Sequence, residues 1–279
     1  GWAQRKLSLL HSTFYKIMKS NNKKNTAAID TAEHDISTLS LIEQEYRLLF
    51  ESLDRDTMPL CRRHHTDGVG YCDHLEESMF PYETLANDYI VTAPLIPTGG
   101  NTPKVEMVRV VATQDATTLT YDPPQGGAPG AIGQAGAWIE LANNPGDFQI
   151  SADKPILVVQ YMEGQDAGGN SGDPAMATAV AKSQYRNNYL FHAPTNYETS
   201  YVNIVAPTGE AVLLDGANVN GFTPIGGTGF SIARVGVSNA GDGNHNASSA
   251  KPFGISVYGY GQYTSYWYPG GSDLTVLHE

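Results

Sequence analysis

Apolar residues change their spacing along this chain, and the change falls near residue 59. Over residues 4–19 they recur every three to four positions, which predicts an amphipathic helix. These positions are Leu7, Leu10, Phe14, Ile17 and Met18. A second helical pattern follows the polar run at 20–25, and Ser40 with Glu43 matches a capping box inside it, so this part is one helix or two. Its apolar positions are Ile29, Ile36, Leu39, Ile42, Tyr46, Leu49, Phe50 and Leu53.

Residues 1–58 are therefore predicted to form an α-helical segment. Two interpretations of this segment stay open. It is either a helical hairpin packed on its own chain, or a coiled-coil or bundle contact between subunits. The second interpretation is indicated by a wide apolar stripe with little else helical in the chain to cover it.

From residue 59 onward the pattern is that of β-strands. Runs of β-branched and aromatic residues are bounded by Gly, Pro and Asn, as strands are. The clearest runs are 105–113, 154–162, 200–207 and 253–261. Composition agrees, because Tyr (16) outnumbers Phe (8) and 29 glycines are available for turns. We predict a mainly β body.

This body contains an internal repeat. The sequence NDYIVTAP at 87–94 returns as NNYLFHAP at 187–194, and SADKPILVVQYMEGQ at 151–165 returns as SSAKPFGISVYGYGQ at 248–262. The repeated unit has about 100 residues. We predict tandem β-sandwich-like repeats, arranged as a helical segment 1–58, a first β-sandwich repeat 59–166 and a second 167–279.

Charge is distributed unevenly along the chain. Residues 1–63 carry ten Lys/Arg against eight Asp/Glu, whereas residues 64–279 carry seven against twenty-one, a balance of −14. So acidic a body repels phosphate backbones, which excludes nucleic acid as a partner. No apolar run is long enough for membrane insertion, so we expect a soluble protein. The partner classes that remain are other proteins, further copies of this chain and glycans.

Two cysteines and one glycosylation sequon bear on whether the protein is secreted. Cys61 and Cys72 are close enough in sequence to close a small disulfide loop, although two free thiols are the alternative. Asn246 begins an Asn-Ala-Ser sequon in what reads as a polar loop, a candidate glycosylation site. The chain opens GWAQ, so we expect a processed product or a piece of a longer protein, and the missing signal peptide does not count against secretion.

The stretch CDHLEESMFP at 72–81 is the densest set of candidate ligands and acid/base groups. These are Asp73, His74, Glu76 and Glu77, with His64 and His65 upstream. A metal site or a carboxylate-based hydrolase would need them to converge in a cleft. In the aligned stretch 172–181 only the Asp recurs, as Asp173, which favours a turn residue whose carboxylate accepts backbone N–H groups.

Other polar loops give weaker signals. Asp242, Asn244 and Asn246 alternate like the first oxygen ligands of a calcium loop, but the required Gly and Glu do not follow. The Gly-rich run at 225–231 is expected to be a hairpin, because a strand pattern and no Lys follow it. No Gly-x-Ser-x-Gly elbow, zincin helix or catalytic Cys is present. We therefore predict no enzyme, no cofactor apart from calcium as an option, and no metal site apart from weak candidates at Asp73 and His74 and, for calcium, at Asp242 and Asn244.

Aromatic residues gather near the end of the chain. They are Tyr258, Tyr260, Tyr263, Tyr266, Trp267 and Tyr268. Such side chains combine a large contact area with a polar group, so they are candidates for binding a ligand. This cluster supports an alternative hypothesis of a carbohydrate-binding module, with calcium assistance as an option.

These motifs together resemble a known family. CDHLEESMFP, DYIVTAP, SADKPILVVQYM, GDPAM, IGGTGFS and YTSYWYPGG occur in the order found in the IgGFc-binding protein N-terminal domain family. The resemblance covers about 59–274. Members are secreted mucus-associated proteins of animals and bacterial surface proteins. The helical pattern of residues 1–58 departs from the family, which usually has further β structure there.

The resemblance implies a non-enzymatic, secreted or cell-surface protein with a structural or adhesive role. It also implies a Cys61–Cys72 disulfide in an oxidising compartment, because a Cys precedes the CDHL motif by this interval in the family. It does not imply binding to antibody Fc. We expect protein–protein assembly through the β-rich body and the helical N-terminus.

Overall fold

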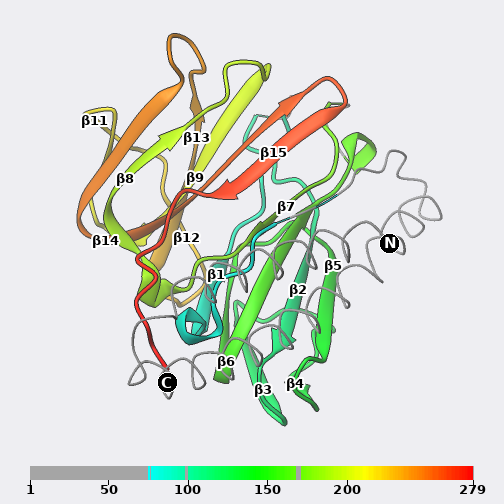
Figure 1. Ribbon diagram of the computed structural model, residues 1–279. Coiled ribbons are helices and arrows are strands. Elements are labelled where there is room, and N and C mark those ends of the chain that lie inside the picture. Colours follow the sequence, from blue (N-terminus) through cyan, green and yellow to red (C-terminus); the bar gives the residue numbers. More distant parts are fainter. Residues whose placement is uncertain (1–74, 76, 98–99, 168–170, 279) are drawn as a thin grey trace, which may run out of the picture. The chain divides into compact units, whose positions relative to one another are not determined.

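The computed structural model describes residues 75, 77–97, 100–167 and 171–278, and its regular structure there is almost entirely β (Figure 1). All of these residues belong to one unit, Leu53–Glu279. The predicted mainly β fold is therefore confirmed for the described part of the chain. The predicted helical segment 1–58 lies outside the described residues.

The first sheet contains seven antiparallel strands, drawn from cyan to green in Figure 1. Its strands are β1 (Ala86–Val91), β2 (Glu106–Ala112), β3 (Thr117–Asp122), β4 (Ala131–Ile132), β5 (Trp138–Asn144), β6 (Phe148–Met162) and β7 (Ala175–Thr178). β6 is its centre, because β1, β2, β3 and β7 all pair with it. β7 follows the predicted domain boundary at residue 166 in sequence, yet it pairs with β6.

The second sheet contains eight antiparallel strands, drawn from yellow-green to red. Its strands are β8 (Arg186–His192), β9 (Thr199–Pro207), β10 (Val212–Leu214), β11 (Ala217–Asn218), β12 (Thr223–Pro224), β13 (Phe230–Val237), β14 (Asn244–Gly261) and β15 (Thr264–Pro269). β14 is its centre and pairs with β8, β9, β10 and β15. Three short 3-10 helices complete the described elements: η1 (Tyr82–Thr84), η2 (Gln165–Ala167) and η3 (Lys182–Gln184).

Each central strand belongs to two layers. The first half of β6 pairs with β1 and β3, and its second half pairs with β2 and β7. Between the halves, Asp153, Lys154 and Pro155 have no partner in these ladders, and Pro has no N–H to donate. β14 repeats this arrangement around Ala250, Lys251 and Pro252. Each sheet therefore curls over itself.

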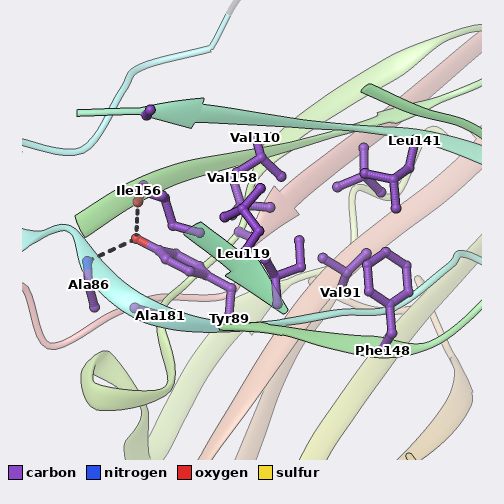
Figure 2. Packing of buried hydrophobic residues seen from close by; sticks show 14 of the residues in the cluster. Ala86, Tyr89, Val91, Val110, Leu119, Leu141, Phe148, Ile156, Val158 and Ala181 are labelled. Atoms are coloured by element: carbon purple, nitrogen blue, oxygen red, sulfur yellow. Dashed lines mark hydrogen bonds between the residues drawn. The ribbon is translucent and has the colours of Figure 1, made fainter. Parts of the chain in front are cut away.

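The core of the first sheet lies between its two layers. Figure 2 shows Val110 and Val158 pointing toward Tyr89 and Phe148 of the other layer. The hydroxyl of Tyr89 donates to the carbonyl of Ile156 at 2.8 Å and accepts the N–H of Ala86 at 3.1 Å. These bonds satisfy a polar group that is otherwise buried, so the ring can extend across the core.

The second sheet has the corresponding tyrosine. The Tyr189 hydroxyl donates to the carbonyl of Phe253 at 2.5 Å and accepts the N–H of Arg186 at 3.0 Å. Strand registers also correspond, since Val110 pairs with Val158 in the first sheet and Ile204 with Ile255 in the second. The two sheets thus share the same central pairing.

The sheets meet at a junction where the second sheet binds the backbone of residues 92–95. Asn203 Nδ2 donates to the carbonyl of Ala93 at 3.1 Å, and Arg234 Nε donates to the same oxygen at 3.0 Å. The Tyr260 hydroxyl donates to the carbonyl of Leu95 at 2.8 Å. Apolar contacts accompany these bonds: the buried residues Ile90, Tyr185, Val205, Ile225 and Ile232 form one cluster.

Gly254 is a position where this junction tolerates no side chain. A Cβ added there would overlap the buried ring of Tyr185. We expect Gly254→Ala to lower the free energy of unfolding by about 1–3 kcal/mol, because the buried ring of Tyr185 must shift to admit the added methyl group. Chemical denaturation measures this. Gly236→Ala in β13 is the control, since its Cβ would lie 3.9 Å from the nearest atom of Tyr201. Equal effects in the two variants would contradict the prediction.

Candidate functional site

The densest sequence motif lies largely outside the described residues. Cys61, Cys72, Asp73, His74 and Glu76 are in that undescribed part, so the disulfide and the metal or acid/base site there stay predictions. Glu77 is described, and its Oε1 accepts the N–H of Ser78 at 2.8 Å. Within the described ranges, no three His, Cys, Asp or Glu side chains gather as a metal site would require.

Asp242 and Asn244, the weak calcium candidates, form a local turn. Asp242 Oδ1 accepts the N–H of Asn244 at 3.1 Å, and its Oδ2 accepts Asn244 Nδ2 at 3.0 Å. These two bonds hold the carboxylate as an Asx-type turn acceptor, and they also lower the pKa of Asp242. The Asn amide nitrogen, not its oxygen, faces the carboxylate. Calcium binding here stays a prediction.

The sequon does not lie in a loop, which corrects that expectation. Asn246 is exposed and is part of β14, where it pairs with Leu190 of β8. Its backbone N–H donates to Asp215 Oδ1 at 2.9 Å, and its Nδ2 lies 3.4 Å from the same oxygen. β14 begins at Asn244, whereas the run predicted from the sequence begins at residue 253. Glycosylation itself stays a prediction.

The six aromatic candidates do not share one surface. Tyr258 and Tyr260 are fully buried and Trp267 is 5% exposed, in a cluster with Met162, Ala175 and Ala177 of the first sheet. Tyr266 and Tyr268 are half-buried, and Tyr263 is 56% exposed. Buried rings cannot meet a glycan at the surface, so three of the six drop out of the carbohydrate-binding hypothesis. They belong to the contact between the two sheets instead.

The Gly-rich run at 225–231 is the expected hairpin between β12 and β13. The N–H of Ile225 donates to the carbonyl of Phe230 at 2.9 Å and closes it. The N–H of Gly227 donates to both carboxylate oxygens of Asp122, at 3.0 and 3.1 Å. A side chain of the first sheet thus occupies the backbone donor of this loop.

Buried charged groups near the junction were missed by the sequence analysis. Glu106 is 0% exposed, and its Oε2 accepts Gln160 Nε2 at 2.9 Å. Burial raises the pKa of Glu106 well above its usual value, although the Gln160 bond opposes this. Lys104 is also 0% exposed and lies over the ring of Tyr260 at 5.3 Å. Burial lowers the pKa of Lys104 to about 8, against the carboxylates of Glu163 and Asp173.

A partly buried ion pair joins the sheets directly. Arg234 Nη2 of the second sheet pairs with Asp147 Oδ1 of the first, and Asp147 Oδ1 also accepts the N–H of Ala93 at 3.2 Å. Burial raises the pKa of Asp147, while Arg234 opposes that shift. Arg234 and Asp147 bind one another, so this ion pair links the two sheets at the junction.

An exposed apolar feature lies on the second sheet instead. Leu190 of β8 is 78% exposed, the highest value among the large apolar residues of the described part. It borders a groove of about 400 Å³, which we call the Leu190 groove. The groove is lined by Leu190, Phe191, His192, Pro194, Asn244 and Tyr268. The only sequence signal for it is that Leu190 aligns with Ile90 of the repeat.

Comparison with known proteins assigns the family. The sequence model of the family described as IgGFc binding protein matches residues 57–259. The chain belongs to this family. The resemblance predicted over about 59–274 is therefore confirmed. The matched range of the IgGFc binding protein family includes strands of both sheets, from β1 to most of β14.

Two further comparisons identified no individual relative of this chain. Searches of curated proteins and of solved structures found no match to this chain. None of the helices in the described residues has the length and apolarity that a membrane crossing requires.

Proposed function

We propose that this chain is a non-enzymatic extracellular structural or adhesive protein, in which the β body and a helical N-terminal segment join protein partners. The observation that carries the proposal is membership of the IgGFc binding protein family, a non-enzymatic binding family. The family name refers to antibody Fc. We do not extend that partner to this chain, because membership of the family does not by itself identify a partner.

A duplicated unit is part of this proposal. We propose that residues 72–165 and 172–262 are two copies of one β-sandwich-like module. Support comes from the paired tyrosines Tyr89 and Tyr189, which make the same two hydrogen bonds. The matching bends at Pro155 and Pro252 add to it. Tandem modules suit an adhesive protein, because repeated units present repeated surfaces.

Secretion belongs to the same proposal. In an oxidising compartment Cys61 and Cys72 would form a disulfide at the start of the first module, and Asn246 would be open to glycosylation. Asn246 is exposed on β14, which supports the second point. The proposed partners are proteins or further copies of this chain.

The helical segment is the part of the proposal that is easiest to test. We expect the full chain to self-associate, and a variant lacking residues 1–58 to be monomeric. The physical reason is that an amphipathic helix with a wide apolar stripe needs a partner to cover it. Light scattering over a concentration series measures the mass. An unchanged oligomeric state after deletion would remove assembly from the proposed function.

A full-length variant guards against misfolding of the deletion. Leu7→Ser, Leu10→Ser and Phe14→Ser together remove the apolar stripe while keeping the chain length. Ser8→Ala with Ser12→Ala is the control, because these positions lie off the stripe. Near-UV circular dichroism verifies that the β body is intact in each variant. Loss of assembly in the control as well would argue against a role for the stripe.

A further inference from the structure

The Leu190 groove occupies a special position in the repeat. Residues 187–194 align with residues 87–94, so Leu190 corresponds to Ile90. Ile90 is only 5% exposed, because it packs with Val205 and Ile232 of the second sheet. Leu190 is 78% exposed. In the first sheet, the surface around Ile90 packs against another layer. In the second sheet, the corresponding surface around Leu190 is therefore uncovered.

The uncovered surface lies beside an edge strand. β8 pairs with β14 alone among the described strands (Figure 1). Its counterpart β1 has an additional bridge, from Tyr89 to Ala181. The second sheet thus offers a groove beside a strand that, among the described residues, pairs with β14 alone.

The backbone polar groups of residues 92–95 and of the corresponding residues 192–194 are bonded differently. This difference indicates which kind of partner each surface can bind. At residues 92–95 the backbone depends on the second sheet, which supplies Asn203, Arg234 and Tyr260 as donors. At the corresponding residues 192–194 the backbone groups find hydrogen-bond partners within the second sheet itself. The Tyr268 hydroxyl accepts the N–H of His192 at 3.0 Å and donates to its carbonyl at 2.7 Å.

The neighbouring backbone groups are also satisfied within the second sheet. The N–H of Ala193 donates to the carbonyl of Gly243 at 2.7 Å, and the carbonyl of Pro194 accepts the N–H of Tyr197 at 3.4 Å. The backbone N–H and carbonyl of His192, the N–H of Ala193 and the carbonyl of Pro194 therefore already have partners within the second sheet. What the groove offers is apolar contact, which suits the apolar stripe of a helix.

The sequence predicts a helix of the right character within the chain itself. Residues 1–28 carry six Lys/Arg and no Asp or Glu, whereas residues 64–279 have a balance of −14. Within 4–19 the stripe of Leu7, Leu10 and Phe14 is flanked by basic residues. Asp242, exposed at the turn that leads into Asn244, supplies a negative charge next to the groove. Apolar and charged features of segment and groove are thus complementary.

We propose that the Leu190 groove binds the amphipathic segment 4–19 of a second copy of this chain. This rests on the proposed function, because it names the surface to which the helical segment docks. Segment and groove are different parts of the chain, so the contact is heterologous. Repeated contacts of this type form rings or open polymers, as a structural or adhesive protein requires.

A charge placed in the groove tests the proposal in the full-length protein. We expect Leu190→Glu to weaken self-association by about tenfold or more, because a charge replaces a buried apolar contact. Leu213→Glu in β10 is the matched control, since Leu213 is a 38% exposed apolar residue of the same sheet. Sedimentation over a concentration series gives both constants. Equal association in Leu190→Glu and the parent protein would overturn the proposal.

Crosslinking locates the partner. A photoreactive amino acid at position 190 in unlabelled protein, mixed with ¹⁵N-labelled full chain, is expected to crosslink to labelled peptides from residues 1–28. Crosslinks confined to one chain would overturn the second-copy assignment, and crosslinks to other regions would overturn the segment. If deletion of 1–58 abolishes assembly while Leu190→Glu does not, the proposed function stands and the groove is wrong. If deletion has no effect, the proposed function itself falls.

Discussion

Replacing Asn203 by Leu is expected to lower the free energy of unfolding by about 3 kcal/mol. Asn203 is 1% exposed at the junction of the two sheets. Its Nδ2 donates to Thr92 Oγ1 and to the carbonyl of Ala93, both at 3.1 Å, and its Oδ1 accepts the Tyr258 hydroxyl at 2.9 Å. Leu has a similar size but no polar atoms. The variant therefore leaves a buried hydroxyl and buried acceptors without these partners.

The consequence reaches beyond one side chain. The Tyr258 hydroxyl also accepts the N–H of Leu95 at 2.9 Å, so it orients the backbone that the second sheet binds. Urea unfolding monitored by tyrosine fluorescence measures the loss. Asn220→Leu is the control, because Asn220 is exposed and its Nδ2 makes one local bond of 3.3 Å to Asn218; its effect should stay within about 0.5 kcal/mol. A loss below about 1 kcal/mol for Asn203→Leu would show that the junction is not held by this amide.

Much of the β body follows from local sequence patterns. The predicted runs 105–113 and 200–207 correspond to β2 (Glu106–Ala112) and β9 (Thr199–Pro207) within two residues. Both strands are largely buried and rich in β-branched residues, so burial and β propensity agree. The pattern works here because neither strand changes layer along its length.

The two central strands were predicted too short. β6 begins at Phe148 and β14 at Asn244, whereas the runs seen in sequence begin at 154 and 253. The sequence KP in each strand resembles a boundary, because Pro usually ends a ladder. In this fold each Pro marks a bend at which the strand passes from one layer to the other. The misplacement of Asn246 in a loop has the same cause.

The candidate site was harder to predict than the fold, for a physical reason. Alternation of side chains along β14 shows that Tyr258 and Tyr260 share a face, but not what covers that face. The covering sheet comes from residues about 100 positions earlier in the chain. Conversely, Leu190 reads as an ordinary core residue of β8, and its exposure appears only when the packing of both sheets is known. Which surface is free is thus a property of tertiary structure.

The buried carboxyl of Glu106 is expected to make stability fall as pH rises. In the unfolded chain a Glu carboxyl loses its proton near pH 4.3. Burial raises the pKa of Glu106 in the folded state, and Asp147 and Glu163 raise it further, while Gln160 and Arg234 oppose the shift. Between the two pKa values the folded state binds one more proton than the unfolded chain. The free energy of unfolding therefore decreases through this range.

Glu106→Gln should remove this dependence. Gln keeps the size of the side chain and carries no charge, so the variant is expected to be more stable than the parent at neutral pH. The difference should grow by about 1.4 kcal/mol for each unit by which the folded pKa exceeds the unfolded one. Unfolding free energies at pH 5, 6, 7 and 7.5 measure it. This range lies below the pKa of about 8 of Lys104, whose own contribution rises with pH above that value.

A control variant separates the effect of burying a carboxyl from the effect of changing the net charge. Glu198→Gln removes one negative charge at an exposed position after β8, where Glu198 Oε1 accepts the N–H of Gln262 at 3.3 Å. Its effect should stay within about 0.5 kcal/mol. A difference for Glu106→Gln that does not change between pH 5 and 7.5 would mean that the carboxyl is ionised in the folded state throughout. Glu106 Oε1 has no hydrogen-bond partner in the described part of the chain, so an ionised carboxylate would stay largely uncompensated there. A neutral Glu106 beside Gln160 is the arrangement that the burial of this junction favours.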